Sequence, residues 1–283
     1  TAPCYWLSPG GAILIGAMVG LSGAGMQTIL GNPLADPFTL GVSASASVGA
    51  SLAIAFGWAV IPSAGPLIVT ANAFAFALAA SLVLFALTKM RGVSAETMIL
   101  VGIALLFTSN ALLALIQYRS NETQLQQIVF WMMGSLGRAS FDKILVCTVA
   151  LGIALPWMLA RGWLLTALRL GDERAESLGV KVDRLRLEVL AVVSLLAAIA
   201  VAFAGTNGFV GLVGPHIARL IVGEDQRFFL PPAALASAMI LSLASTLSKA
   251  ITPGVIYPIG MITAFIGVPF FVSLILSIRH RGA

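Results

Sequence analysis

Long stretches without charge alternate with short polar segments along this 283-residue chain, and the apolar stretches predict membrane spans. A helix needs about 20 apolar residues to cross the hydrocarbon core of a bilayer. Residues 37–88 form one charge-free run long enough for two spans, and the segment Ile61–Pro66 (IPSAGP) supplies the turn between them. Four further simple spans are expected near residues 10–30, 97–118, 228–248 and 258–278, and a shorter one at 144–160.

The segment 189–218 is too long for one simple helix, and small residues interrupt it. We expect a span from Val189, a glycine-rich reversal, and a short span that runs to about Val222, which brings the total to nine. The interruptions are at Gly205, Gly208, Gly211, Gly214 and Pro215.

Charged positions are concentrated in one segment, residues 161–188. Eleven of the chain's 27 Lys, Arg, Asp and Glu residues lie in these 28 positions, with apolar runs on both sides. This pattern predicts a water-exposed platform held against a membrane-embedded body, through which force enters the protein.

Composition supports a single membrane domain over residues 1–283 and an all-α polytopic bundle. With 59% hydrophobic and 10% charged residues, the chain has too little polar surface for a soluble domain of this length. The net charge of +5 does not indicate nucleic-acid binding, because no basic run is interleaved with aromatic residues. We therefore expect membrane lipid, and no nucleic acid, among the partners.

The distribution of Lys and Arg predicts the orientation. With the platform inside, twelve of these residues lie in inner segments and four in outer segments. This bias puts the C-terminus in the cytoplasm and the N-terminus outside. Residues 1–9 show no export signal, so we expect a further span before Thr1.

Several kinds of chemistry lack the residues they require. The chain has no Gly-Lys dipeptide and hence no phosphate-binding loop of the GxxxxGK[ST] type. Two cysteines and two histidines, far apart, do not indicate a metal site. No acidic residue lies in the middle of a predicted span, which disfavours an ion-coupled carrier, and no Ser, His and Asp constellation supports an intramembrane hydrolase.

Small residues recur every fourth position in three predicted helices and indicate close helix packing. They are Gly16, Gly20 and Ala24, then Gly41, Ser45, Gly49 and Ala53, and finally Gly260 and Ala264.

Four motifs occur in a fixed order. They are Gln27–Gly41 (QTILGNPLADPFTLG), Leu170–Val180 (LGDERAESLGV), Gly208–Arg219 (GFVGLVGPHIAR) and Pro258–Phe271 (PIGMITAFIGVPFF). Together they resemble the FecCD family, the permease subunits of ATP-driven importers for iron-siderophores, haem and vitamin B12. The resemblance extends from about Gly10 to the C-terminus. It implies a ten-helix subunit, used as a homodimer or close heterodimer, with two ATPase subunits and a substrate-binding protein.

The resemblance also implies roles for particular residues. The counterpart of the second motif enters a cleft of the ATPase, with Ala175 and Leu178 as a small apolar knob and charged residues around it. The predicted coupling residues are Gly171, Asp172, Glu173, Arg174, Ala175, Glu176, Ser177, Leu178 and Gly179. The turn Asn32–Pro37, at the inner end of the first span, is expected to be rigid and to lie near the ATPase contact.

Other roles concern the path and its two ends. Ser94 corresponds to the cytoplasmic gate, and Trp131, Met132 and Met133 correspond to a short helix along the path. Anchoring of Trp131 in the membrane interface is an equally good interpretation. Lys249 and Arg138 are expected to dock the binding protein, although residues 1–9 lack the basic pair usual in the family.

The sequence thus predicts a transport subunit of the bacterial cytoplasmic membrane that is not itself an enzyme. It binds no cofactor or metal, and ATP and Mg²⁺ belong to the partner ATPase. An iron-siderophore is the first expectation for the substrate, with haem and cobalamin as alternatives.

Overall fold

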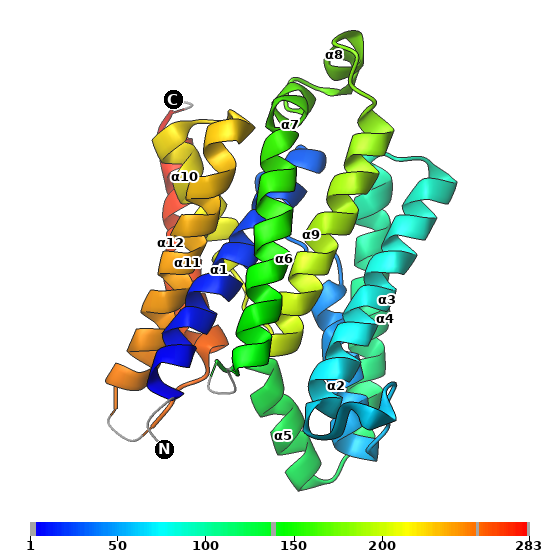
Figure 1. Cartoon of the computed structure of the whole chain (residues 1–283), viewed down its shortest axis with the longest axis vertical. Helices are drawn as coiled ribbons and strands as arrows, with labels where there is room; N and C mark the ends of the chain where they lie inside the picture. Colours follow the sequence, from blue (N-terminus) through cyan, green and yellow to red (C-terminus); the bar gives the residue numbers. More distant parts are fainter. Residues whose placement is uncertain (1–3, 137–139, 253–254, 282–283) are drawn as a thin grey trace.

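The structure is a computed structural model that describes residues 4–136, 140–252 and 255–281, and helices are the only regular elements in these ranges (Figure 1). The longer helices are α1 (Cys4–Ile29), α3 (Ile68–Arg91), α4 (Ala95–Arg119), α6 (Phe141–Ala160), α9 (Val182–Ala204), α11 (Gln226–Ala250) and α12 (Ile259–Arg281). The shorter ones are α2 (Val42–Phe56), η1 (Pro62–Leu67), α5 (Glu122–Met132), α7 (Gly162–Leu168), α8 (Asp172–Ser177) and α10 (Val210–Val222).

Each of the nine predicted spans corresponds to a helix, which confirms the all-α membrane bundle. Among the described residues, six helices have the length and apolarity needed to cross a bilayer, and α2, α10 and part of α12 are shorter apolar helices. The turn expected at Ile61–Pro66 is the short helix η1 with its flanking residues. The helix expected from Val189 starts seven residues earlier, at Val182, so the last part of the charged segment belongs to α9.

Helix α1 lies at the centre of the bundle and packs against α6, α9, α10 and α11. Small residues make this possible, as the sequence predicted. A Cβ atom on Gly16 would lie 2.7 Å from the Ala238 Cα atom of α11, and one on Gly20 would lie 2.5 Å from the Ala233 carbonyl oxygen. The two backbones are therefore in direct contact.

The connection between α1 and α2 turns back into the bundle. Asn32 Oδ1 accepts a hydrogen bond from the Leu34 N–H group at 2.9 Å, and Asp36 Oδ1 accepts one from Phe38 at 3.0 Å, which confirms the rigid turn. Gly41 then lies against the backbone of Leu106, near the middle of α4. Helix α2 consequently starts inside the bundle, which explains why it has only 15 residues.

One residue of this turn lies inside the protein, and the location of the turn near an ATPase contact stays a prediction. Asp36 is 2% exposed, and its carboxylate lies beside Gly211 at the start of α10, inside the protein. It is therefore not available for an ATPase contact.

The glycine-rich reversal separates α9 from α10, as predicted. The α9 helix ends at Ala204, and Gly205 has a positive φ of 75°. Phe209, directly before α10, also has a positive φ, 68°, and is the non-glycine residue with this conformation among the described residues.

Candidate functional site

The predicted coupling segment contains a six-residue helix, α8, between two glycines with positive φ. Gly171 precedes it with φ 99°, and Gly179 follows it with φ 82°. The N–H groups of Gly179 and Val180 donate to the carbonyl groups of Glu176 and Ala175, at 2.9 and 3.0 Å. These two bonds form the Schellman motif that ends many helices, so the chain positions α8 through its backbone.

The outward face of α8 carries most of the predicted coupling residues. Exposed positions are Asp172, Glu173, Arg174, Glu176, Ser177 and Leu178, with both glycines. Leu178 is 55% exposed and can act as an apolar contact. Ala175 has no exposed surface, however, and the prediction that it forms part of an exposed knob was wrong. It packs inward together with Val180 in the core of the bundle.

A buried arginine joins α8 to the other elements at its end of the bundle. Arg186 on α9 is 6% exposed, and its guanidinium binds both carboxylate oxygens of Asp172 at 2.7 and 2.8 Å. Its Nε donates to the carbonyl group of Ile29, the last residue of α1, at 3.0 Å. Nη1 also lies 3.4 Å from the carbonyl oxygen of Val93.

Sequence reasoning missed Arg186, although a signal was present. Val182, Leu185 and Val189 are buried at helical spacing, and Arg186 falls on the same face of α9. A charged residue on an otherwise apolar face needs a partner inside the protein.

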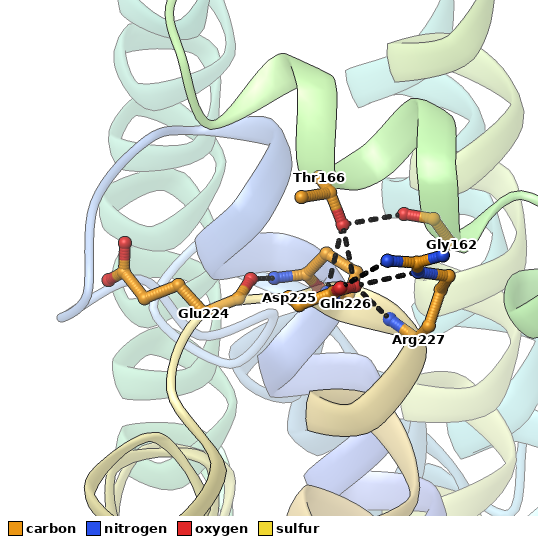
Figure 2. A network of polar contacts seen from close by, with 6 residues as sticks. All are labelled: Gly162, Thr166, Glu224, Asp225, Gln226 and Arg227. Carbon is orange, nitrogen blue, oxygen red and sulfur yellow. Dashed lines mark hydrogen bonds and ion pairs between the residues drawn. The ribbon is translucent and has the colours of Figure 1, made fainter.

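A polar network joins α7, which precedes α8 in the chain, to the start of α11 (Figure 2). The Thr166 hydroxyl accepts the Gln226 N–H group at 2.9 Å and lies 3.2 Å from Asp225 Oδ1. Asp225 also forms an ion pair with Arg227 at 2.6 Å. Hydrogen bonding to Arg227 lowers the pKa of Asp225 to about 2, so this network is ionised at any physiological pH. An ion pair from Arg169 to Glu224 adds a second link between these elements.

The predicted gate residue Ser94 lies in the turn between α3 and α4, at the same end of the bundle as α8 (Figure 1). Its side chain caps α4, because Oγ accepts a hydrogen bond from the Thr97 N–H group at 3.1 Å. Ser94 is partly exposed. Its role as a gate stays a prediction.

The predicted path residues lie at the opposite end, where α5 meets α9 and α12. The Ser135 N–H group donates to Ala204 at the end of α9, and the Gly260 N–H group of α12 donates to Met133, both at 2.9 Å. Met132 and Met133 are partly buried. Trp131 is only 9% exposed, which contradicts its interpretation as a membrane-interface anchor.

Trp131 instead lines a cavity of about 500 Å³. The other lining residues are Ile54, Val69, Thr123, Gln126, Gln127 and Phe130. The cavity thus combines apolar and amide groups at the end of the bundle opposite α8, and its role as part of a path stays a prediction.

One of the two predicted docking residues, Lys249, lies in the described part of the chain. Lys249 is exposed near the end of α11, at the end of the bundle where α5 lies (Figure 1). Arg138 lies outside the described residues. Within the described ranges, no group of three His, Cys, Asp or Glu residues could hold a metal ion.

A polytopic helical bundle with an exposed, glycine-bounded helix at one end is the architecture expected of a membrane permease. Comparisons with known proteins agree. Residues 5–277 match the FecCD transport family, and the chain belongs to that family.

Relatives of known sequence cover most of the chain. A putative ABC transporter permease of Methanocaldococcus jannaschii is 41% identical over 95% of this chain and 79% of its own length. The hemin transport permease HmuU of Yersinia pestis is 35% identical, over 95% of this chain and 81% of its own length. The vitamin B12 permease BtuC of Vibrio vulnificus is 36% identical, over 94% and 79%.

A solved structure shares the fold. It is described as an inward-facing conformation of a putative metal-chelate type ABC transporter. The two chains superpose with a TM-score of 0.87 at 32% identity, covering 96% of this chain and 85% of the other. The protein is thus a permease subunit of an ABC importer of the FecCD type.

Proposed function

We propose that this permease works as one of two membrane subunits that carry an iron-siderophore complex into the cell. A binding protein delivers the complex to the outer face near Lys249, and two ATPase subunits bind at the α8 end. The C-terminus then lies in the cytoplasm. Relatives act on haem, vitamin B12 and iron chelates by their names, which supports a bulky metal chelate as the class of substrate.

One observation carries the coupling part of this proposal. Helix α8 is presented to solvent by two glycine turns, its outward face is charged around the exposed Leu178, and its inward face is anchored by Ala175. A short rigid helix with a polar rim and an apolar centre has the anatomy of a docking element.

The outer cavity supports the substrate class. One subunit alone contributes a cavity of about 500 Å³. Its surface combines the aromatic rings of Trp131 and Phe130 with the amide groups of Gln126 and Gln127. Aromatic faces and uncharged hydrogen-bonding groups suit a large chelate whose metal is already saturated by its own ligands.

The test is transport by the reconstituted importer. Vesicles containing the permease, its ATPase and its binding protein are supplied with a labelled ferric siderophore, labelled haemin or labelled cobalamin. We expect ATP-dependent uptake of the ferric siderophore and little uptake of the other two.

Two results would contradict the proposal. ATP-dependent uptake of haemin or cobalamin in place of the ferric siderophore would show that the proposed substrate is wrong. Uptake driven by an ion gradient without the ATPase would show that transport is not driven by ATP. Permease with Leu178→Asp in the same vesicles serves as the uncoupled control.

A further inference from the structure

We propose that Arg186 is the positioning residue that transmits movement of the coupling helix to the cytoplasmic gate. This inference rests on the proposed function, in which α8 contacts the ATPase. It concerns how a displacement of α8 reaches the turn before α4, which the comparisons do not address.

The Arg186 side chain joins α9 to three other segments of the protein. Arg186 belongs to α9, binds Asp172 of α8 through two nitrogens, and donates to Ile29 at the end of α1. It also approaches Val93 in the α3–α4 turn. A shift of Asp172 therefore acts on three other segments without passing through solvent.

The chemistry of the guanidinium group suits these contacts. A guanidinium has five N–H donors in a rigid plane, and here the plane addresses a carboxylate on one edge and backbone carbonyls on the others. The Ile29 carbonyl is one of the terminal carbonyls of α1 that lack a helical partner, so the contact satisfies it. A lysine has one nitrogen and cannot reproduce this geometry.

Burial makes the charge of Arg186 dependent on its partners. A charge that is 6% exposed is costly to place inside a protein unless all its hydrogen bonds are made. Its partner Asp172 is half exposed, with a side-chain exposure of 48%, and lies on the helix that the ATPase is proposed to contact. The ion pair thus has one fixed end inside the bundle and one end at the docking surface.

Val93 lies next to the predicted gate. It directly precedes Ser94, the residue that caps α4. The α4 helix has 25 residues and runs the length of the bundle (Figure 1). Movement of the Val93 carbonyl therefore changes the start of α4, where the gate is predicted.

The test follows two positions in the complete importer, with and without ATP trapped by vanadate. In a chain carrying Cys4→Ser and Cys147→Ala, a cysteine is placed on α8 (Ser177→Cys) or at the start of α4 (Glu96→Cys). Both positions are exposed. The rate of labelling by a membrane-impermeant maleimide reports the coupling helix in the first case and the gate in the second.

In the parent protein we expect trapping to protect Ser177→Cys and to change the Glu96→Cys rate about tenfold. Arg186→Lys should keep the protection at Ser177→Cys and reduce the change at Glu96→Cys to less than about twofold. Asp172→Asn, which keeps the shape of the side chain and removes its charge, should also reduce the change in labelling rate at Glu96→Cys. Substitution of a residue that only stabilises the fold would affect the responses at Ser177→Cys and Glu96→Cys alike.

Arg184→Lys is the matched control, because Arg184 forms an ion pair with Glu188 within α9, the helix that carries Arg186, but its side chain is 74% exposed. It should leave both rates as in the parent. Full nucleotide response at Glu96→Cys in Arg186→Lys and Asp172→Asn would overturn the inference. Absence of protection at Ser177→Cys in the parent would instead overturn the proposed docking of α8.

Discussion

At the scale of single residues, Ala175 of α8 and Leu178, which caps the end of α8, show how a separation of three residues divides two roles. Both were predicted to contact the ATPase. The structure buries Ala175 completely and leaves Leu178 55% exposed. The first therefore holds α8 on the bundle, and the second remains available for a partner.

This division predicts different outcomes for the same substitution. Leu178→Asp should leave the melting temperature unchanged and weaken ATPase binding at least about tenfold, since it places a charge at the apolar centre of the contact. Ala175→Asp should destabilise the permease by about 3 kcal/mol, because it buries an unpaired charge. Thermal unfolding in detergent and co-purification with the ATPase measure the two effects.

A Leu178→Asp protein that binds the ATPase normally would exclude Leu178 from the contact. An Ala175→Asp protein of unchanged stability would contradict the burial of Ala175.

Sequence reasoning predicted those residues whose role is local. The helix-ending glycines and the Asn32 and Asp36 turns depend on neighbouring backbone atoms, and the structure confirms them. The burial of Ala175 and the contacts of Arg186 depend on elements distant in the sequence, such as α1. A six-residue helix contains too few turns for its pattern to indicate which face is covered.

At the scale of elements, the contact between α1 and α11 is set by the absence of side chains. Gly20 lies so close to α11 that a Cβ atom would be 2.4 Å from Ser237 Oγ and 2.5 Å from the Ala233 carbonyl oxygen. Gly152 on α6 has no atom within 4 Å of the corresponding position. The same residue type thus has opposite surroundings on two neighbouring helices.

We expect Gly20→Ala to destabilise the bundle by about 1 to 3 kcal/mol, because the helices must separate to accommodate the methyl group. Gly152→Ala should be neutral or stabilising by about 0.5 kcal/mol, since alanine favours a helix more than glycine does. Melting temperatures of the two purified variants in the same detergent provide the comparison. Equal effects would show that the α1–α11 contact is loose.

The limits of prediction at this scale lie at the ends of helices. The start of α9 was placed at Val189, because Asp183, Arg184, Arg186 and Glu188 have the composition of a surface segment. The structure continues the helix back to Val182, with Val182 and Leu185 buried under those charges. The return of the α1–α2 connection into the bundle had no signal in hydropathy, since a charge-free run does not report where in the membrane a helix begins.

At the scale of the whole molecule, the structure separates two functional ends. Helices α7 and α8 and the α3–α4 turn lie at one end, and α5 lies at the other (Figure 1). Helix α9 reaches both, because Arg186 contacts Asp172 near its start and Ala204 accepts a hydrogen bond from Ser135 at its end. This arrangement agrees with the bias of twelve inner against four outer basic residues.

The orientation can be tested directly by cysteine labelling in sealed vesicles. In the background without native cysteines, Glu176→Cys on α8 should react with an impermeant maleimide only from the cytoplasmic side. Thr123→Cys on α5 should react only from the outer side, because both positions are exposed at opposite ends. Reaction of Glu176→Cys from outside would reverse the topology and remove the basis for an ATPase contact at α8.

The construction of α8 has a consequence for how cells keep several importers apart. Two glycine turns and an inward-facing alanine fix the helix, so the five outward side chains from Glu173 to Leu178 contribute little to its fold. These side chains are free to diverge, and exchanging them between related permeases should redirect each one to the other's motor subunit. A few exchangeable positions would then determine which ATPase each permease binds. Hybrid importers could be assembled without altering the transport path.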